Sequence, residues 1–399
     1  MKLNNCIRFC IVLLVLNSCS NPEKKIYSQV ETIAIPEGNE YNLLNESVIE
    51  DITIIPLETQ DNCLVGNIDH VESFNNQYFI EDTRNKSLFV FDSEGKFIFK
   101  LHAVGQGPGE YIEIRDFKFD NDGNLLILDF NKILKYNSSN GKFISDFKFN
   151  YLNSKNLQLN PLQFIPLNDE GFYFWRGSFG VEDSNCNNMF ALYKANKKGE
   201  IVDKYFKLER PMLGSINRFS RYSANCYYMQ TFQGNDTIYS ISEKGVIPTY
   251  AIDFGKRAVP NNYLPKGFKG LGKIYFDMRE NLGYCHDIDN ILESKDFLYF
   301  TFLCKGGRGE ALYSKKSGSI KVGKYLFHSL PSAVGFRCFN RDKNEFISIM
   351  DDYSVSDIIE GKTENEKYYS LFDKQIMKAI ENKSDISNPC LIVYKLKGF

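Results

Sequence analysis

The chain has 399 residues, of which 43% are hydrophobic and 15% aromatic, with 33 Phe and 24 Tyr. This composition supplies a large core that is rich in strand-forming side chains. The formal net charge of -2 provides no basic field, so we expect no nucleic acid among the partners.

The extreme N-terminus has the pattern of a secretion signal. Lys2 and Arg8 flank the start of the apolar run Phe9–Leu16, which is too short to span a bilayer as a helix. The next residues complete the tetrapeptide Leu-Asn-Ser-Cys, which resembles a bacterial lipobox and implies that Cys19 is lipidated and becomes the mature N-terminus. Cleavage to a soluble periplasmic protein is the alternative.

The chain therefore divides into a signal peptide (residues 1–18), a lipidated cysteine with a polar tether (19–45) and a folded domain (46–399). We expect the protein in the bacterial cell envelope, held to a membrane by its lipid. The outer membrane is favoured over the inner one, and periplasmic or surface display stays open.

The folded domain repeats one unit, in which short apolar strands alternate with tight turns. The clearest copy follows the loop Gly105–Tyr111 with strands at Asp116–Asp120, Asn124–Asp129, Lys132–Tyr136 and Phe143–Phe149. A unit of this kind cannot bury its own faces, so copies must stack. The glycine turn before the outermost strand recurs at Gly95, Gly141, Gly199, Gly245 and Gly318. This spacing predicts the four-stranded blades of a β-propeller.

The last predicted hairpin, Glu345–Met350 with Cys390–Lys395, ends the chain without an outermost strand. Near the start of the folded domain, Ile52–Leu57 has the pattern of a strand that belongs to no blade. Pairing the two would close the ring and leave no long sheet edge exposed. We therefore predict an all-β, six-bladed β-propeller of four-stranded blades, closed by an N-terminal strand.

Two insertions interrupt the repeats. Residues 256–289 contain Pro260, Pro265 and several Gly, and we expect a partly helical excursion between blades. Residues 351–389 lie inside the last hairpin, where Lys367–Lys383 carries apolar residues at helical spacing. We expect this short amphipathic helix to pack on the propeller, with a partner or membrane contact as the alternative.

The loop Gly105–Tyr111 and the following Asp120–Asp129 resemble an NHL repeat, in which a Gly-Pro-Gly loop leads to an inner strand, a glycine turn and a strand ending in Asp. Together with Asn235–Tyr239 and Tyr250–Gly255, they make the chain similar to the bacterial six-bladed β-propeller lipoproteins. The resemblance covers nearly all of the mature chain. It implies the fold and the lipidation, and it supplies no catalytic residues.

Cysteines and histidines point to no metal or cofactor. Seven of the ten cysteines lie beyond Cys19, none at CxxC spacing, and we interpret them as small buried side chains, with one or two disulfides as an open alternative. The four histidines lie far apart in the sequence, so we expect no metal site and no cofactor. A Gly-x-Ser-x-Gly nucleophile elbow is also absent from the sequence.

Polar residues occupy the loop between the second and third strands in every predicted blade, and these loops meet at one mouth of a propeller. The candidate ligand-binding residues there are Asp82, Arg84, Asp129, Asn131, Trp175, Arg176, Asp236, Arg308 and Asp351. Such a ring would hold a glycan, a peptide or a protein ligand. The alternatives are that the polar residues only accept backbone hydrogen bonds in their turns, and that Trp175 lies in the core.

These patterns favour a membrane-tethered binding or interaction protein without catalysis. The alternative is a propeller-type lyase or hydrolase acting on carbohydrate or a lactone. Catalysis of that kind would need a cluster such as His286 with Asp287 and nearby carboxylates.

Overall fold

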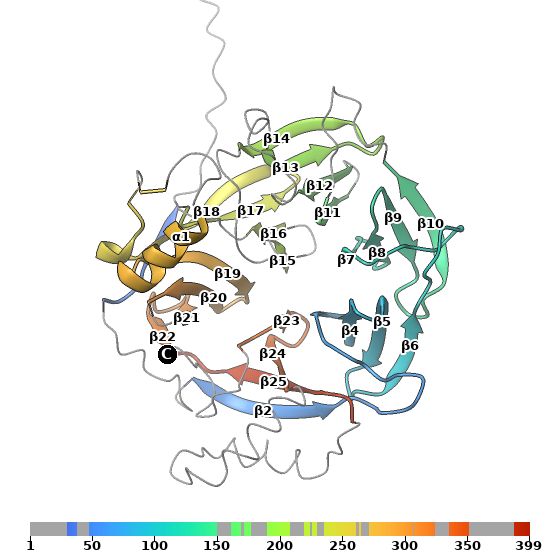
Figure 1. Cartoon of the computed structure of the whole chain (residues 1–399). Coiled ribbons are helices and arrows are strands. Elements are labelled where there is room, and N and C mark those ends of the chain that lie inside the picture. The colour runs from blue at the N-terminus through green and yellow to red at the C-terminus, as the bar shows by residue number, and fades with distance from the viewer. Residues whose placement is uncertain are drawn as a thin grey trace, which may run out of the picture.

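The computed structural model describes residues 30–37, 48–149, 161–168, 171–176, 190–207, 219–223, 226–229, 235–260, 263–264, 271–305, 307–323, 335–350 and 387–399. These residues form six sheets that follow one another around a ring, with one edge strand of each sheet toward the centre and the other toward the outside (Figure 1). Each sheet is one blade, so the predicted six-bladed β-propeller is confirmed.

The first three blades each take four antiparallel strands from one continuous stretch of chain. Blade 1 contains β3 (His70–Phe74), β4 (Gln77–Asp82), β5 (Ser87–Asp92) and β6 (Phe97–Leu101). Blade 2 contains β7 (Asp116–Phe119), β8 (Leu125–Leu128), β9 (Lys132–Tyr136) and β10 (Phe143–Lys148). Blade 3 contains β11 (Gln163–Leu167), β12 (Gly171–Trp175), β13 (Phe190–Ala195) and β14 (Ile201–Lys207).

The other three blades include two strands from the N-terminal part of the chain. Blade 4 contains β15 (Phe219–Ser223), β16 (Cys226–Met229), β17 (Thr237–Ser242), β18 (Gly245–Asp253) and, as a fifth strand, β1 (Glu31–Ala34). Blade 5 contains β19 (His286–Glu293), β20 (Phe297–Cys304), β21 (Gly307–Ser314) and β22 (Ile320–Gly323). Blade 6 contains β23 (Cys338–Asn340), β24 (Glu345–Met350), β25 (Cys390–Leu396) and β2 (Ile49–Pro56).

Six apolar clusters hold the ring together, one between each pair of neighbouring blades. Between blades 1 and 2, for example, Phe79 and Val90 pack with Phe117 and Ile127, and all four are fully buried. Because every blade has a neighbour on both sides, both faces of its sheet are covered, and β8 is apolar at each position. Each side chain buried in this way stabilises the fold by about 1.5–3 kcal/mol.

The glycine turns predicted from the repeat adopt the backbone conformation for which glycine is suited. All five have positive φ, from 68° at Gly141 to 114° at Gly245. At Gly95 a Cβ atom would also clash with the carbonyl oxygen of Pro56 in β2. A glycine is therefore needed there both for the turn and for the close approach of the strand that closes the ring.

The N-terminal strand closes the ring as predicted. β2 pairs antiparallel with β25, from Ile49 opposite Leu396 to Pro56 opposite Cys390. In Figure 1 the blue β2 lies beside the red β25 at the outer edge of blade 6. The two ends of the chain thus complete one sheet.

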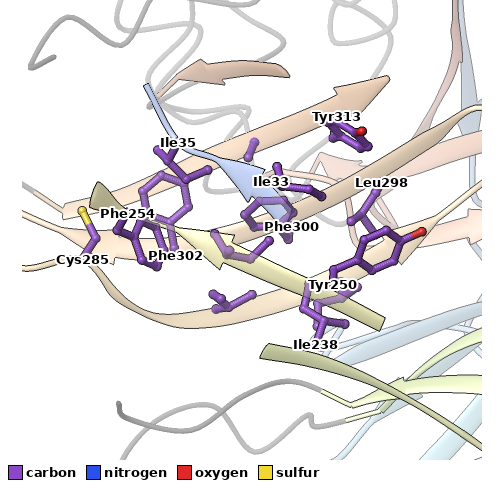
Figure 2. Close-up of a cluster of buried hydrophobic side chains, with 14 of the residues drawn as sticks. Ile33, Ile35, Ile238, Tyr250, Phe254, Cys285, Leu298, Phe300, Phe302 and Tyr313 are labelled. Atoms are coloured by element: carbon purple, nitrogen blue, oxygen red, sulfur yellow. The ribbon is translucent and has the colours of Figure 1, made fainter. Parts of the chain in front are cut away.

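A second N-terminal strand, β1, was not predicted and lies within residues 19–45, the stretch assigned to the tether. It runs parallel to β18 along the outer edge of blade 4. Ile33 in β1 and Ile35 just after it are buried and point into the cluster that contains Phe300 and Phe302 (Figure 2). Part of the assigned tether is therefore integral to the propeller.

The insertion after blade 4 is partly helical, as predicted. It contains a 3₁₀ turn at Gly255–Arg257, the helix α1 (Leu271–Phe276) and a π-helical turn at Asp277–Asn281. One boundary is corrected, because residues 286–289 begin β19 and belong to blade 5. Among the described helices none has the length and hydrophobicity of a membrane span. The helix expected at Lys367–Lys383 lies outside the described residues.

The structure contains a disulfide between Cys285 and Cys304, whose Cα atoms are 4.3 Å apart. It joins the residue before β19 to the last residue of β20, within blade 5. This is the alternative that the sequence left open. Cys63 and Cys338, in contrast, are buried thiols in the cluster between blades 6 and 1, in agreement with the simpler interpretation.

Candidate functional site

Asp82 is a fully buried acceptor for backbone amides, which was the structural alternative for this residue. One carboxylate oxygen accepts the N–H groups of Gly66 (2.8 Å) and Asn67 (3.3 Å). The other accepts the N–H of Asn85 at 2.9 Å. The carboxylate therefore fixes the loop that leads into β3 against the loop that follows β4.

Asp129 has the same role in blade 2. Its two carboxylate oxygens accept the N–H groups of Ile112 (3.2 Å) and Glu113 (3.4 Å), which lie in the loop before β7. Lys132 lies 4.0 Å away. Asp129 is 2% exposed, so a ligand would find little of the carboxylate to bind.

The other candidates from the loop ring do not converge. Trp175 is 1% exposed and packs in the core with Phe219, so it has no face free for stacking on a sugar. Arg84 and Asn131 are exposed, Arg176 is half-buried, and Arg308 lies 3.6 Å from Asp289. Asp351 and the proposed lipidation site Cys19 lie outside the described residues.

Asp236 stands apart because it lies near a histidine. Burial raises the pKa of Asp236 to about 6, with Asp287 raising it further and His286 opposing the rise. His286 is 3% exposed, and its Nδ1 lies 3.2 Å from an oxygen of Asp287 without hydrogen-bond geometry. His286 and Asp287, the cluster that the enzyme alternative would need, thus lie close together and within electrostatic reach of the candidate carboxylate Asp236.

A different set of charges meets at the centre of the ring. These residues, which we call the central cluster, lie on or next to the innermost strands of four blades. The set consists of Glu72 on β3, Asp116 and Lys118 on β7, Arg221 on β15 with Tyr227 on β16, and Arg341 directly after β23.

Glu72 and Arg221 belong to blades 1 and 4, which the order of the interblade cores places on opposite sides of the ring. The charge of Arg221 nevertheless acts on Glu72, and its guanidinium lies 5.3 Å from the ring centre of Phe74 in blade 1. Phe74 in turn stacks on Phe119 of blade 2 at 4.1 Å. Arg221 therefore reaches across the centre of the propeller, and the cluster is one connected site.

Glu72 is held in its ionised form. Burial alone would raise the pKa of Glu72, but a hydrogen bond with His70 and the charges of Lys118 and Arg221 lower it to about 2. His70 lies 3.2 Å and Lys118 3.8 Å from the same carboxylate oxygen. At neutral pH this carboxylate is a fixed negative charge.

Lys118 is the most buried cation of the central cluster, at 2% exposure. It donates a hydrogen bond to Asp116 at 2.7 Å and another to the carbonyl oxygen of Phe117 at 3.0 Å. Although burial opposes it, Asp116 and Glu72 raise the pKa of Lys118 above the ordinary value. The remaining oxygen of Asp116 accepts the N–H of Phe164 in blade 3 at 3.0 Å.

Two polar atoms of the central cluster have no hydrogen-bond partner among the described residues. They are Nε of Arg221 and the hydroxyl of Tyr227, a residue that is 1% exposed. Burial raises the pKa of Tyr227, so its hydroxyl keeps its proton and remains a donor. Leaving a buried polar group without a partner costs about 1–3 kcal/mol, which marks this part of the molecule as unusual.

Arg341 completes the cluster from the turn between β23 and β24. Burial and the charge of Arg221 lower the pKa of its guanidinium, so the two like charges lie within electrostatic reach of each other. Across the described parts of the chain, no three His, Cys, Asp or Glu side chains are grouped so that they could hold a metal ion. The donors and acceptors of the central cluster are of the kind that could hydrogen-bond to a polar group.

The sequence contains a signal for this cluster that is separate from the polar residues of the loops. Glu72 and Lys118 occupy the third position of the short innermost strands β3 and β7, and Arg221 holds the third position of β15. A charge repeated at one position of the innermost strands indicates a shared environment at the centre of the ring.

The family model described as "Domain of unknown function (DUF4934)" matches residues 30–395. No curated protein matches the chain. Among solved structures, one described as an exported protein from Bacteroides fragilis is 16% identical, with a TM-score of 0.65, and covers 93% of this chain and 100% of its own. A member of the DUF4221 family from Bacteroides vulgatus is 12% identical, with a TM-score of 0.50, and covers 88% of this chain and 98% of its own.

A virginiamycin B lyase from Staphylococcus aureus is also similar at 12% identity, covering 75% of this chain and 82% of its own, but its TM-score of 0.38 is too low to support an argument. At such identities the solved structures establish the propeller fold alone. The family match spans the strands β1 to β25 and all six blades. The chain is a member of the DUF4934 family.

Proposed function

We propose that this protein is an exported, lipid-anchored binding protein that holds a polar ligand at the centre of its propeller. The observation that carries the proposal is the meeting of Glu72, Lys118 and Arg221 from three blades. Charges buried at the centre of a fold cost stability unless each is paired. A protein that keeps them together with unpartnered donors gains by binding a complementary ligand.

Loop carboxylates such as Asp82 do not share this property, because their oxygens already accept backbone amides. The ring of loops proposed from the sequence is therefore the weaker candidate. The central cluster also lacks a side chain placed as a nucleophile with an adjacent base within the described residues. Binding without chemical conversion is the function that this geometry supports best.

A thermal-shift screen of the full chain tests the binding proposal. The ligand set contains neutral, acidic and amino sugars and short peptides, and a ligand should raise the melting temperature in a saturable way. The shift should vanish in a Glu72→Gln, Arg221→Gln variant and persist in a Glu94→Gln, Lys96→Gln control, whose residues are exposed in an outer turn of blade 1. Absence of any shift in the wild type, or a shift that survives in the central variant, would contradict the proposal.

The lipid anchor is tested separately, because Cys19 lies outside the described residues. Substitution of Cys19→Ala should move the protein from the membrane to the soluble fraction and remove the mass of the acyl chains. A variant that fractionates with the wild type would show that the anchor is wrong without touching the binding proposal.

A lyase or hydrolase remains the second candidate, favoured by the group of Asp236, His286 and Asp287. A carboxyl group whose pKa is about 6 suits general acid or base catalysis near neutral pH. Turnover of a panel of lactones, followed by proton release, would support this function if Asp236→Asn abolished it and the central variant did not. Equal turnover in Asp236→Asn would exclude this group as the catalytic site.

A further inference from the structure

The positive charges of the central cluster are not balanced by its carboxylates. Glu72 is engaged by His70 and Lys118, and Asp116 by Lys118 and the N–H of Phe164. Each carboxylate thus has partners before either arginine is counted.

The two arginines have no such partners at short range. Arg221 contacts aromatic faces, and Arg341 lies beside Asp342 in its turn. Among the described residues neither guanidinium forms an ion pair with a carboxylate of the cluster. Two guanidinium groups within electrostatic reach of each other therefore share an excess of positive charge.

We propose that Arg221 and Arg341 form a subsite for one oxyanion, a carboxylate or a phosphate group of the ligand. The inference rests on the proposed binding function and names the chemical class of the group that is bound. A guanidinium presents its N–H groups as a planar fork that matches the two oxygens of a carboxylate or phosphate. One anion between two such forks would also relieve the repulsion between them.

The surroundings of Arg221 leave its N–H edge available. Its guanidinium lies over the faces of Phe74 and Phe119, at 5.3 and 5.9 Å from the ring centres. An arginine stacked in this way uses its face for the aromatic contact and keeps its edge for hydrogen bonds. Nε of Arg221 and the hydroxyl of Tyr227 are donors without partners in the described structure, and both suit an anion.

The subsite lies toward one end of the ring axis. This end carries the turns between the innermost strand of each blade and the next strand, such as the turns β3–β4 and β23–β24. Phe74 is the last residue of β3, and Arg341 follows β23 directly. Asn75, Asn76 and Lys343, in the turns beside them, are exposed, so this end of the axis faces solvent. It is opposite the end that carries the loops of Asp82 and Asp129.

The test is isothermal titration of the full chain with inorganic phosphate, with D-galacturonate and with D-galactose, which lacks the carboxylate. Phosphate or galacturonate should bind, and galactose should bind at least tenfold more weakly than galacturonate. Arg341→Gln should lower the affinity for the anion by about ten- to a hundredfold, because the hydrogen bonds from the guanidinium to the charged group are lost. The anion affinity of Arg341→Lys should lie between those of the wild type and Arg341→Gln, because lysine keeps the positive charge but lacks the planar fork of N–H groups.

Lys343→Gln is the matched control, because it removes the same charge from the same turn at an exposed position. It should leave the anion affinity within about twofold. Preference for phosphate over galacturonate would identify a phosphorylated ligand, and the reverse would identify an acidic sugar.

Three results would overturn the subsite: no binding of either anion at millimolar concentration, equal binding of galactose and galacturonate, or anion binding unchanged in folded Arg341→Gln protein. A neutral ligand found by the thermal-shift screen, together with any of these results, would leave the binding function intact and remove only the anion. If the thermal-shift screen also found no ligand, both the anion subsite and the binding function would be contradicted. Thermal melts of each variant show whether it is folded, and Arg341 in its turn is the safer of the two arginines to replace.

Discussion

The loop carboxylates and the central cluster place buried charges in one fold for opposite reasons. Asp82 and Asp129 are surrounded by backbone N–H groups of their own blades, and their hydrogen-bonding capacity is used within the loops. Glu72, Lys118 and Arg221 come from different blades and face one another across the centre. The first kind of charge stabilises the fold, whereas the second kind, which meets unpartnered donors, is the basis of the proposed ligand site.

The largest expected effect comes from removing the cation between the two carboxylates of the central cluster. Lys118→Met keeps the volume of the side chain but leaves Asp116 and Glu72 buried without their cation. The free energy of unfolding should fall by about 3–5 kcal/mol. Urea denaturation at pH 7 measures this loss, and Lys135→Met, at a half-buried surface pair with Asp120, is the control with an effect of at most about 1 kcal/mol. Equal losses in the two variants would mean that the central pairings are ordinary surface contacts.

The next effect tests the structural side of the comparison. Asp82→Ala leaves the N–H groups of Gly66 and Asn85 without their acceptor and should cost about 3 kcal/mol. Asp129→Ala should cost less, because its hydrogen bonds are longer. Asp122→Ala, whose side chain is 81% exposed, is the control. Neither loop variant should change ligand binding. A variant that lost binding but kept the stability of the wild type would show that these loops belong to the binding site.

The pH dependence of stability separates two glutamates of blade 1. The folded pKa of Glu72 is about 2, below its ordinary 4.5, so its contribution is present above pH 4.5 and is lost as the pH falls toward 2. Burial raises the pKa of Glu81 to about 7, so the unfolded chain ionises first, and stability is lost as the pH rises from 4.5 to 7.

Substitution of Glu81→Gln should therefore raise the free energy of unfolding at pH 8 by roughly 2–3 kcal/mol and change it little at pH 4. Glu72→Gln should lower the free energy of unfolding at pH 7 and have little effect on it below pH 2. Denaturation at several pH values, with Glu94→Gln as an exposed control, measures both. A Glu81→Gln variant with the same gain at pH 4 and pH 8 would show that ionisation is not the cause.

The smallest expected effect is the most specific to a ligand site. Arg341→Gln removes one of two like charges that repel each other, so the protein without ligand should be unchanged or more stable by up to about 1 kcal/mol. Its melting temperature shows the sign of the change. A loss of more than about 1 kcal/mol would mean that Arg341 serves the fold, as Asp82 does.

The repeat made the fold predictable, because strands such as Leu125–Leu128 and the turn at Gly95 are local patterns with a local cause. The closing strand could be inferred by counting strands, since only one hairpin lacked an outer partner. The strand at Glu31–Ala34 could not, because it is four residues long and depends on a parallel partner that lies more than 200 positions away.

The candidate site was harder to predict for a related reason. Glu72 and Arg221 are separated by most of three blades in the sequence, and only the closed ring brings them together. The loop aspartates were visible as polar residues in turns, but the sequence could not show that their oxygens are already used. The burial of Trp175 likewise depends on the neighbouring blade that covers it.

The pairing of β2 with β25 also makes closure of the ring depend on the synthesis of β25. A side-chain hydrogen bond between Glu50 and Lys395 spans 345 positions, so the outer strand β2 has no partner until β25 has been synthesised. Contacts of such long sequence separation form late in folding. A product truncated before Cys390 keeps an open sheet edge, which exposes it to proteolysis and aggregation. Closure of the ring thereby distinguishes chains that contain β25 from chains that lack it.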